Sequence, residues 1–169
     1  MSPKVIFVGP PGAGKTTAAR AVAEVLGLEV RDTDLDIELA EGRSISDIFV
    51  EDGEPHFRLL ETAAVATALA EHDGILALGG GAVTSQATRD VLAGHHVVFL
   101  DVGLSEASHR VGMSAARPLL LGNVRSQLKQ LMDQRRPLYE SVAWRTISTD
   151  GKSRKEVAAE AIALLEELP

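Results

Sequence analysis

Short apolar runs alternate with longer stretches of helical periodicity along this chain. Five runs of four or five residues, most of them rich in Val, Ile, Leu or Phe, have the length of short strands; they are residues 5–8, 28–31, 75–78, 96–100 and 146–149. After the first run, apolar residues recur three or four positions apart, as Ala18, Val22 and Val25 do. Strands that alternate with helices in this way predict parallel βαβ units, and hence an α/β fold with a five-stranded parallel sheet.

Capping residues and prolines predict where the helices begin and end. Gly27 favours the end of a helix over 15–26, and Ser44 the start of a short helix that runs through Phe49. Pro55 suits the first turn of a longer helix, whereas Pro137 predicts that a helix over about 124–136 stops there. The other predicted helices cover 35–40, 85–93, 104–111 and 153–168. No repeat or linker divides the chain, so we expect one domain over residues 1–169.

Composition narrows the possible partners. The 169 residues carry a net charge of −7, which argues against nucleic acids and anionic membranes as partners. Cysteine is absent, so disulfide and thiolate chemistry are excluded. The chain enters its first apolar run at once and has no run of transmembrane length, so we expect a cytoplasmic protein.

Residues 9–17, with the sequence GPPGAGKTT, form the motif that organises the chain. They match G-x-x-x-x-G-K-[ST], the phosphate-binding loop, and they lie between a predicted strand and a predicted helix, the context that the motif requires. Glycines let successive N–H groups point at one anion, and the helix N-terminus adds positive partial charge. Lys15 is expected to reach the β- and γ-phosphates of a nucleotide, and Thr16 to hold Mg²⁺.

Charged residues and glycines follow other predicted strands, where open parallel sheets place their sites. Asp32 and Asp34 come directly after the second run, and each is either a functional carboxylate or only the cap of the next helix. We favour the functional role because the phosphate loop needs a metal ligand and a base nearby. Gly79, Gly80 and Gly81 follow the third run and indicate close approach of the backbone to a ligand.

Arginines supply candidate anion-binding groups. Arg58 and Glu61 lie three residues apart on one helix, and this spacing fits either an exposed ion pair or an anion-binding Arg held by a Glu. Residues 112–122 are bracketed by glycine and predict a mobile lid that carries Arg117. Arg136 ends the helix before Pro137, where it could also complement the helix dipole. Together with Lys15, these residues predict a basic cleft in an acidic chain.

The same residues, in this order and spacing, resemble the shikimate kinase family over essentially the whole chain. The resemblance rests on the phosphate loop, Asp32-Thr33-Asp34, Phe57-Arg58-x-x-Glu61, Gly79-Gly80-Gly81-Ala82-Val83, Arg117-Pro118-Leu119-Leu120 and Arg136-Pro137-Leu138-Tyr139. It implies a P-loop kinase-type three-layer α/β/α sandwich with a lid. It also implies a monomeric enzyme that transfers the γ-phosphoryl of ATP to the 3-hydroxyl of shikimate, with Mg²⁺ as cofactor, and a substrate-binding helical segment over about 34–62.

The resemblance implies a role for each site residue. Asp34 contacts the reacting hydroxyl, Arg58 and Arg136 hold the substrate carboxylate, and Gly80 lies against the substrate between Gly79 and Gly81. Arg117 joins Lys15 at the phosphates, Asp32 helps Thr16 to hold Mg²⁺, and Glu61 supports Arg58. The nucleotide is bound by the loop residues Pro11, Gly12, Ala13, Gly14, Lys15, Thr16 and Thr17. Adenine packs near Arg110 and the loop around Lys152.

Three other functions share the phosphate loop. A GTPase would need D-x-x-G and N-K-x-D, and neither motif occurs in the sequence. A kinase for gluconate or a nucleoside monophosphate lacks paired arginines for a small carboxylate beside a Gly-Gly-Gly strand end. A non-catalytic ATP-binding module would not need Asp34, Arg58, Arg117 and Arg136 together.

Overall fold

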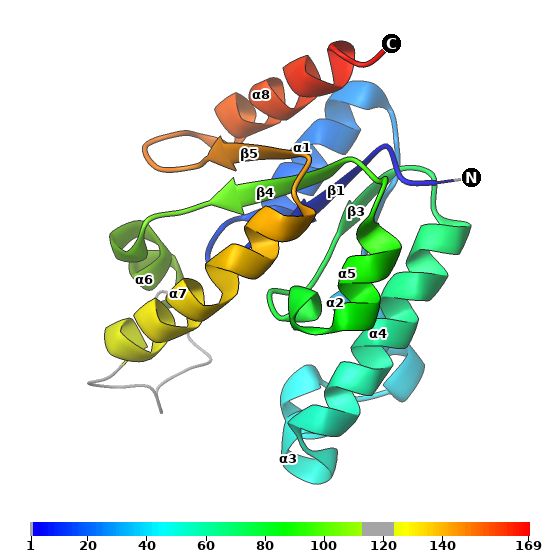
Figure 1. Cartoon of the computed structure of the whole chain (residues 1–169), viewed down its shortest axis with the longest axis vertical. Helices are drawn as coiled ribbons and strands as arrows, with labels where there is room; N and C mark the ends of the chain where they lie inside the picture. Colours follow the sequence, from blue (N-terminus) through cyan, green and yellow to red (C-terminus); the bar gives the residue numbers. More distant parts are fainter. Residues whose placement is uncertain (1, 113–123) are drawn as a thin grey trace.

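The structure is a computed structural model, and the residues that it describes are 2–112 and 124–169. It is a three-layer α/β/α sandwich around one parallel sheet with the strand order β2-β3-β1-β4-β5 (Figure 1). The elements in chain order are β1 (Val5–Val8), α1 (Lys15–Leu26), β2 (Val30–Asp32), α2 (Thr33–Glu41), α3 (Ile45–Asp52), α4 (Glu54–Glu71), β3 (Ile75–Ala77), the 3₁₀ turn η1 (Ala82–Thr84), α5 (Gln86–Leu92), β4 (Val97–Asp101), α6 (Leu104–Gly112), α7 (Val124–Val142), β5 (Arg145–Ser148) and α8 (Arg154–Glu166).

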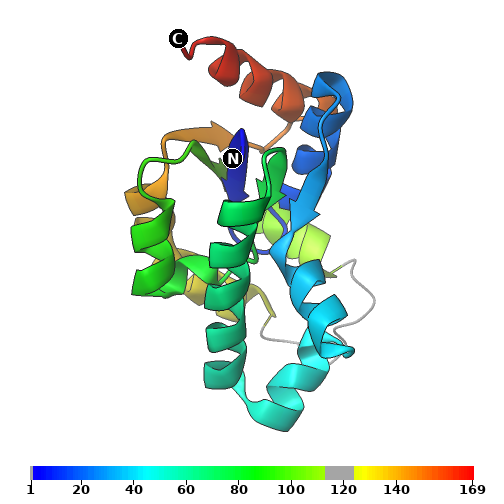
Figure 2. The ribbon, with the colours of Figure 1, turned by 90° about the vertical axis from the view of Figure 1, so that its right-hand side faces the viewer.

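Apolar side chains of the central strands alternate between the two faces of the sheet and form two separate cores. In β1, Val5 and Phe7 join the apolar cluster beneath α1 and α8, whereas Ile6 and Val8 join the cluster beneath α4, α5 and the end of α7. The same alternation continues in β3 and β4, because successive side chains of a strand point to opposite faces. The sheet is therefore buried on both faces, with helices on each side (Figure 2).

A third, smaller cluster forms outside the sheet. Ile37, Ile48 and Phe57 come from α2, α3 and α4 and pack together with Ile45 and Leu60. These helices extend beyond the end of the sheet (Figures 1 and 2). Together they form a compact unit beside the strand ends, and this unit contains the predicted substrate-binding segment, 34–62.

Most predicted elements are found within one or two residues of their expected bounds, and the caps explain why. Gly27 ends α1 in the left-handed conformation with φ 67°, and Ser44 accepts a hydrogen bond from the backbone of Asp47. Ser153 and Glu156 form a capping box at the start of α8. These local signals depend on few tertiary contacts, so the sequence alone predicts them well.

The predicted stop at Pro137 is wrong, because α7 continues through this proline to Val142. Proline in a helix removes the hydrogen bond to the carbonyl four residues earlier, here that of Asp133. Both residues are exposed, so water can bind the free carbonyl. Beyond the proline, Tyr139 is 1% exposed and packs in the second core. The burial of Tyr139 offsets the cost of the proline and keeps the chain helical.

Candidate active site

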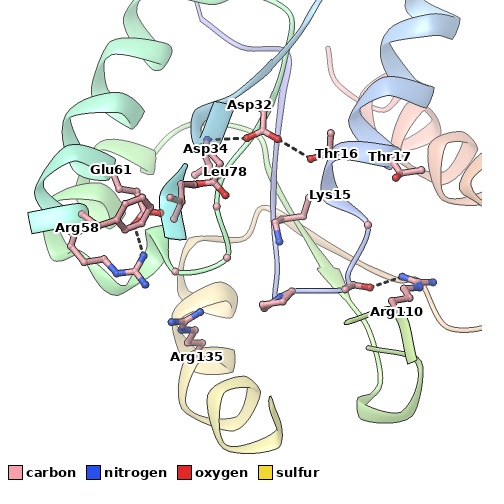
Figure 3. A pocket seen from close by; sticks show the side chains of 18 of the residues that line it. Lys15, Thr16, Thr17, Asp32, Asp34, Arg58, Glu61, Leu78, Arg110 and Arg135 are labelled. Atoms are coloured by element: carbon pink, nitrogen blue, oxygen red, sulfur yellow. Dashed lines mark hydrogen bonds and ion pairs between the residues drawn. The ribbon is translucent and has the colours of Figure 1, made fainter. Parts of the chain in front are cut away.

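A cavity of about 540 Å³ lies at the carboxyl ends of β1, β2 and β3, against the small helical unit (Figure 3). Its polar and charged lining comes from the phosphate loop, the end of β2, α4, the glycines after β3, α6 and α7. The lining residues are Pro11, Gly12, Gly14, Lys15, Thr16, Thr17, Asp32, Asp34, Ile45, Phe49, Phe57, Arg58, Glu61, Leu78, Gly79, Gly80, Gly81, Arg110 and Arg135. Ala13, the remaining residue expected to bind nucleotide, is buried in the loop behind this lining and lines a second, adjacent cavity.

The phosphate loop has the backbone that its glycines predict. Gly12 and Gly14 have φ of 84° and 81°, a region that side chains disfavour, and Gly14 lies directly before the first residue of α1. The Nζ of Lys15 donates to the carbonyls of Gly9 at 2.8 Å and Pro10 at 3.1 Å. Burial lowers the pKa of Lys15 from 10.5 to about 8, against the opposing attraction of Asp34 and Asp32. Its ammonium is thus held at the loop by carbonyls alone, in a setting where an anion would stabilise its charge.

Asp32 caps α2 and also contacts the phosphate loop. Its Oδ1 accepts from the backbone N–H of Asp34 at 2.9 Å and caps α2, while its Oδ2 accepts from the Thr16 hydroxyl at 2.8 Å. These contacts place a hydroxyl and a carboxylate together at the mouth of the phosphate loop (Figure 3). In the described part of the chain, no cluster of three or more His, Cys, Asp or Glu side chains is placed to hold a metal ion. The Thr16–Asp32 pair suits a cation that is bound mainly by water and phosphate oxygens, as Mg²⁺ is.

Asp34 is a carboxylate of the cavity with an oxygen that stays unpaired within the described part of the chain. Its Oδ1 is buried and has no hydrogen-bond partner among the described residues. Burial raises its pKa from 3.8 to about 6, and the negative charges of Asp32 and Glu61 add to this effect while Lys15 opposes it. A buried carboxylate that keeps a free oxygen and binds a proton more tightly than usual is suited to accept a hydrogen bond or a proton from a ligand hydroxyl.

Glu61 is buried and Arg58 is partly buried, so the two do not form the fully exposed ion pair that the spacing alone allows. Arg58 Nη1 donates to Glu61 Oε1 at 2.7 Å, and the Glu61 side chain is only 3% exposed. Burial raises the pKa of Glu61, while the adjacent Arg58 guanidinium opposes the shift. Arg58 also binds Glu54 at the protein surface, 3.1 Å away. Glu61 therefore holds the guanidinium of Arg58 at the cavity wall.

The glycines after β3 leave space for these charged groups. A Cβ atom on Gly79 would lie 2.5 Å from Asp34 Oδ1 and 2.9 Å from Glu61 Oε2, and one on Gly81 would collide with the guanidinium of Arg58. A Cβ atom on Gly80 would lie 3.3 Å from the Cδ of Pro11 in the phosphate loop. At Gly79 and Gly81 a side chain would therefore displace the neighbouring charged groups, whereas at Gly80 a shift of a few tenths of an ångström would suffice.

The structure places Arg135, and not the expected Arg136, at the wall of the cavity. Arg136 is directed to the other side of α7, where it binds both carboxylate oxygens of Asp101 at 2.8 and 2.6 Å and also pairs with Glu140. Arg135 lines the cavity, and in residues 2–112 and 124–169 no carboxylate forms an ion pair with it. Consecutive residues of a helix point about 100° apart, so only one of the two can face the ligand.

A helical stripe in the sequence indicates which of the two arginines faces the cavity. Leu128, Met132, Arg135 and Tyr139 recur at spacings of four, three and four residues, and the three apolar members contact the core. Arg135 lies on this inward stripe and Arg136 does not. The expected stop at Pro137 hid the signal, because it placed Tyr139 outside the helix.

The second cavity, of about 250 Å³, adjoins the phosphate loop on the side of α8. It brings together Arg110 and Lys152, the two residues expected near adenine, with Gly14, Thr17 and the unpredicted Arg154. Arg110 donates to the carbonyl of Gly12 at 2.7 Å (Figure 3), and Lys152 binds Glu160 at 2.8 Å. Both cations therefore lie beside the phosphate loop, although they are distant from it in sequence.

The predicted lid over residues 112–122 and its Arg117 lie outside the described residues, apart from Gly112 at the end of α6. They stay predictions from the sequence. Among the described residues, no helix has the length and apolar character to span a membrane.

Comparison with known proteins identifies similar chains over the full length. The family model for shikimate kinase matches residues 11–166. The shikimate kinase of Salinispora tropica is 57% identical over 165 residues, covering 98% of this chain and 99% of that protein. The one of Thermobifida fusca is 54% identical over 167 residues, covering 99% and 95%.

Solved structures give the same result. Shikimate kinase from Acinetobacter baumannii in complex with shikimate has a TM-score of 0.92 and 35% identity, covering 100% of this chain and 96% of that one. A gluconokinase from Sinorhizobium meliloti has a TM-score of 0.59 and 21% identity, and it shares the fold alone.

Proposed function

This chain belongs to the shikimate kinase family, so it is an ATP-dependent kinase that phosphorylates shikimate, and we propose how the residues of its cavity bind the two substrates and carry out the transfer. The γ-phosphoryl of ATP passes to the 3-hydroxyl of shikimate. The observation that carries the assignment of roles is the meeting of Lys15, Asp34, Arg58 and Arg135 in one cavity.

Arg58 and Arg135 bind the shikimate carboxylate in this proposal. A guanidinium presents a planar fork of N–H donors that matches a carboxylate. Glu61 fixes Arg58 from behind, so the carboxylate would meet a guanidinium that is already oriented. Arg135 lines the cavity from α7, and its charge has no carboxylate partner among the described residues. The guanidinium of Arg136 is already bound to Asp101, so Arg135 is the stronger candidate for the second contact with the substrate carboxylate.

Lys15 and the phosphate loop bind the phosphates of ATP. The carbonyls that now accept from Lys15 are replaced by phosphate oxygens, and the negative charge of the nucleotide stabilises the protonated lysine. Arg117 is proposed to contact the same phosphates. Arg110 and Lys152 bind the adenine side of the nucleotide, supported by the second cavity that they share.

Asp34 orients the 3-hydroxyl of shikimate and accepts its proton as the new phosphorus–oxygen bond forms. Its free buried oxygen and its raised pKa support this role. Positioned general bases contribute roughly 10²–10⁴-fold to rate. In phosphoryl transfer, positioning of the reacting groups and neutralisation of charge supply most of the remaining rate enhancement.

The oxygen atoms of Thr16 and Asp32 fit the requirements of Mg²⁺, which we propose as the cofactor that neutralises phosphate charge during transfer. Thr16 would contribute its hydroxyl directly, and Asp32 would act through water. The hydrogen bond between the two side chains, at 2.8 Å, holds both oxygens at the same edge of the cavity.

In this proposal the protein is a cytoplasmic monomer that binds only small molecules. It is folded as a single domain over 1–169, with a lid over 112–122. The net charge of −7 supports the absence of nucleic-acid and membrane partners. Size-exclusion chromatography with light scattering tests the monomer, which has an expected mass of 17.9 kDa.

Turnover with separate acceptors tests the proposed function. ATP and Mg²⁺ are supplied with shikimate, gluconate or a nucleoside monophosphate, and ADP release is measured. We expect rapid turnover with shikimate only, because gluconate carries its carboxylate on a flexible open chain and a nucleoside monophosphate has no carboxylate. Equal turnover with a nucleoside monophosphate would contradict the proposed roles of Arg58 and Arg135.

A further inference from the structure

We propose that the hydroxyl of Tyr139 is a positioning group for shikimate: it fixes the peptide between Gly80 and Gly81 and the guanidinium of Arg135 in the orientations that the substrate requires. The proposal rests on the proposed function, because it concerns how the same cavity is shaped. Tyr139 does not line the cavity and is not a catalytic residue.

The hydroxyl of Tyr139 connects α7 to the glycine loop. It donates to the carbonyl of Gly80 at 2.6 Å, across 59 positions of sequence. The side chain is 1% exposed, and its ring stacks on Phe99 with the ring centres 5.1 Å apart. Burial raises the pKa of Tyr139 to about 12, so the phenol stays protonated and keeps its proton to donate. Stacking alone would need only a phenylalanine, so the hydroxyl needs another explanation.

All three carbonyls of the glycine loop are bound by groups of the scaffold. The carbonyl of Gly79 accepts from the backbone of Ala82 at 3.1 Å, and that of Gly81 accepts from the Thr84 hydroxyl at 2.6 Å. Tyr139 binds the carbonyl between them. Within residues 2–112 and 124–169, none of the N–H groups of the three glycines donates a hydrogen bond. The loop thus lines the cavity with its acceptors occupied and its donors available.

Peptide geometry links the bond of Tyr139 to these donors. The described residues contain no cis peptide, and in a trans peptide the C=O and N–H groups point in opposite directions. A carbonyl of Gly80 that is held by Tyr139 therefore directs the N–H of Gly81 away from Tyr139. Gly81 lines the cavity beside Arg58, so this N–H is placed to bind an oxygen of the anionic substrate.

Arg135 lies near the same hydroxyl. It is four residues before Tyr139, on the same face of α7. The positive charge of its guanidinium opposes the effect of burial on the pKa of Tyr139, so the two groups lie close together. The hydroxyl therefore donates to the loop beside the arginine, and its loss would alter the surroundings of two proposed substrate-binding groups together.

Tyr139→Phe tests the proposal, because it keeps the ring and removes only the hydroxyl. It leaves the carbonyl of Gly80 without its donor. We expect kcat/KM for shikimate to fall by roughly 10- to 100-fold, mainly through KM, while the Kd of the free enzyme for a non-hydrolysable ATP analogue stays within twofold. Ser141→Ala is the matched control, since Ser141 donates to the carbonyl of Leu138 at 2.7 Å on the same helix, and it should behave as wild type.

A purely structural role of Tyr139 predicts a different result. It would lower the melting temperature and the fraction of active enzyme, while KM for shikimate stayed unchanged. That outcome, or a kcat/KM within twofold of wild type in Tyr139→Phe, would overturn the proposal. Wild-type turnover with shikimate is measured first, so that failure of the proposed function is recognised separately.

The composition of the chain offers a second measurement if Tyr139→Phe does not fold. Tyr139 is the only tyrosine, so growth on 3-fluorotyrosine labels this position alone. We expect one ¹⁹F resonance, which shifts when shikimate saturates the enzyme and also shifts in Arg135→Ala. A resonance that responds to neither change would show that the hydroxyl is not coupled to the substrate-binding groups.

Discussion

Asp34→Asn is expected to make the protein more stable at neutral pH while it abolishes most of the activity. In the folded chain Asp34 is buried, faces Asp32 and Glu61, and leaves Oδ1 without a partner among the described residues. Its pKa is therefore raised from 3.8 to about 6. Asparagine keeps the size of the side chain and removes the buried negative charge.

The magnitude follows from this pKa. A shift of about two units corresponds to roughly 3 kcal/mol between the two protonation states. Because the folded state binds the proton more tightly than the unfolded chain, this group lowers the stability of the wild type as pH rises from about 4 to about 6. Above pH 6 the full cost is present, and below pH 4 it is absent. The attraction of Lys15 is already contained in the pKa of Asp34.

Urea unfolding at pH 4.5 and pH 7.5 measures the effect. We expect the free energy of unfolding of Asp34→Asn to exceed that of wild type by up to about 3 kcal/mol at pH 7.5, and the difference to shrink at pH 4.5. Asp36→Asn, in the same helix, removes the partner of Arg31 at 2.6 Å and should lower stability slightly at both pH values. A less stable Asp34→Asn at pH 7.5 would refute the reasoning from burial.

Three further experiments test individual contacts. Arg135→Ala should raise the Kd for shikimate in calorimetry by roughly 30-fold or more, since losing one side of a buried charge pair costs about 2–5 kcal/mol. Arg136→Ala should leave this Kd unchanged. A larger effect of Arg136→Ala than of Arg135→Ala would restore Arg136 to the site. Lys15→Ala should lower kcat by at least roughly 10²-fold in an ADP-release assay, and near wild-type turnover would remove Lys15 from the mechanism. Gly79→Ala should lose about 1–3 kcal/mol of stability and most turnover, because its Cβ would lie 2.5 Å from Asp34 Oδ1; a stable, active variant would show that the loop can move.

The sequence predicts the parts of this site that depend on local geometry. The phosphate loop needs glycines at fixed spacing before a helix, and Asp32 and Asp34 need only the end of a strand, so their positions follow from short-range rules. Arg135 was missed for a short-range reason as well, because Pro137 outweighed the helical stripe that ends in Tyr139. Helix propensity alone could not predict that burial of Tyr139 would carry α7 past a proline.

The charges of the cavity depend on tertiary pairing, which no local pattern contains. The sequence alone points to Arg58 and Arg136 as anion-binding groups and not to Arg135, although the three side chains are chemically identical. In the fold, Glu61 supports Arg58 from the buried side, Asp101 occupies Arg136, and no carboxylate of the described residues pairs with Arg135. A guanidinium at a cavity wall without an internal counter-ion is stabilised most by a ligand anion. In the proposed function, what selects the substrate-binding arginine is therefore the position of the carboxylates around it, and these come together only when α4, α7 and the end of β4 pack against one sheet.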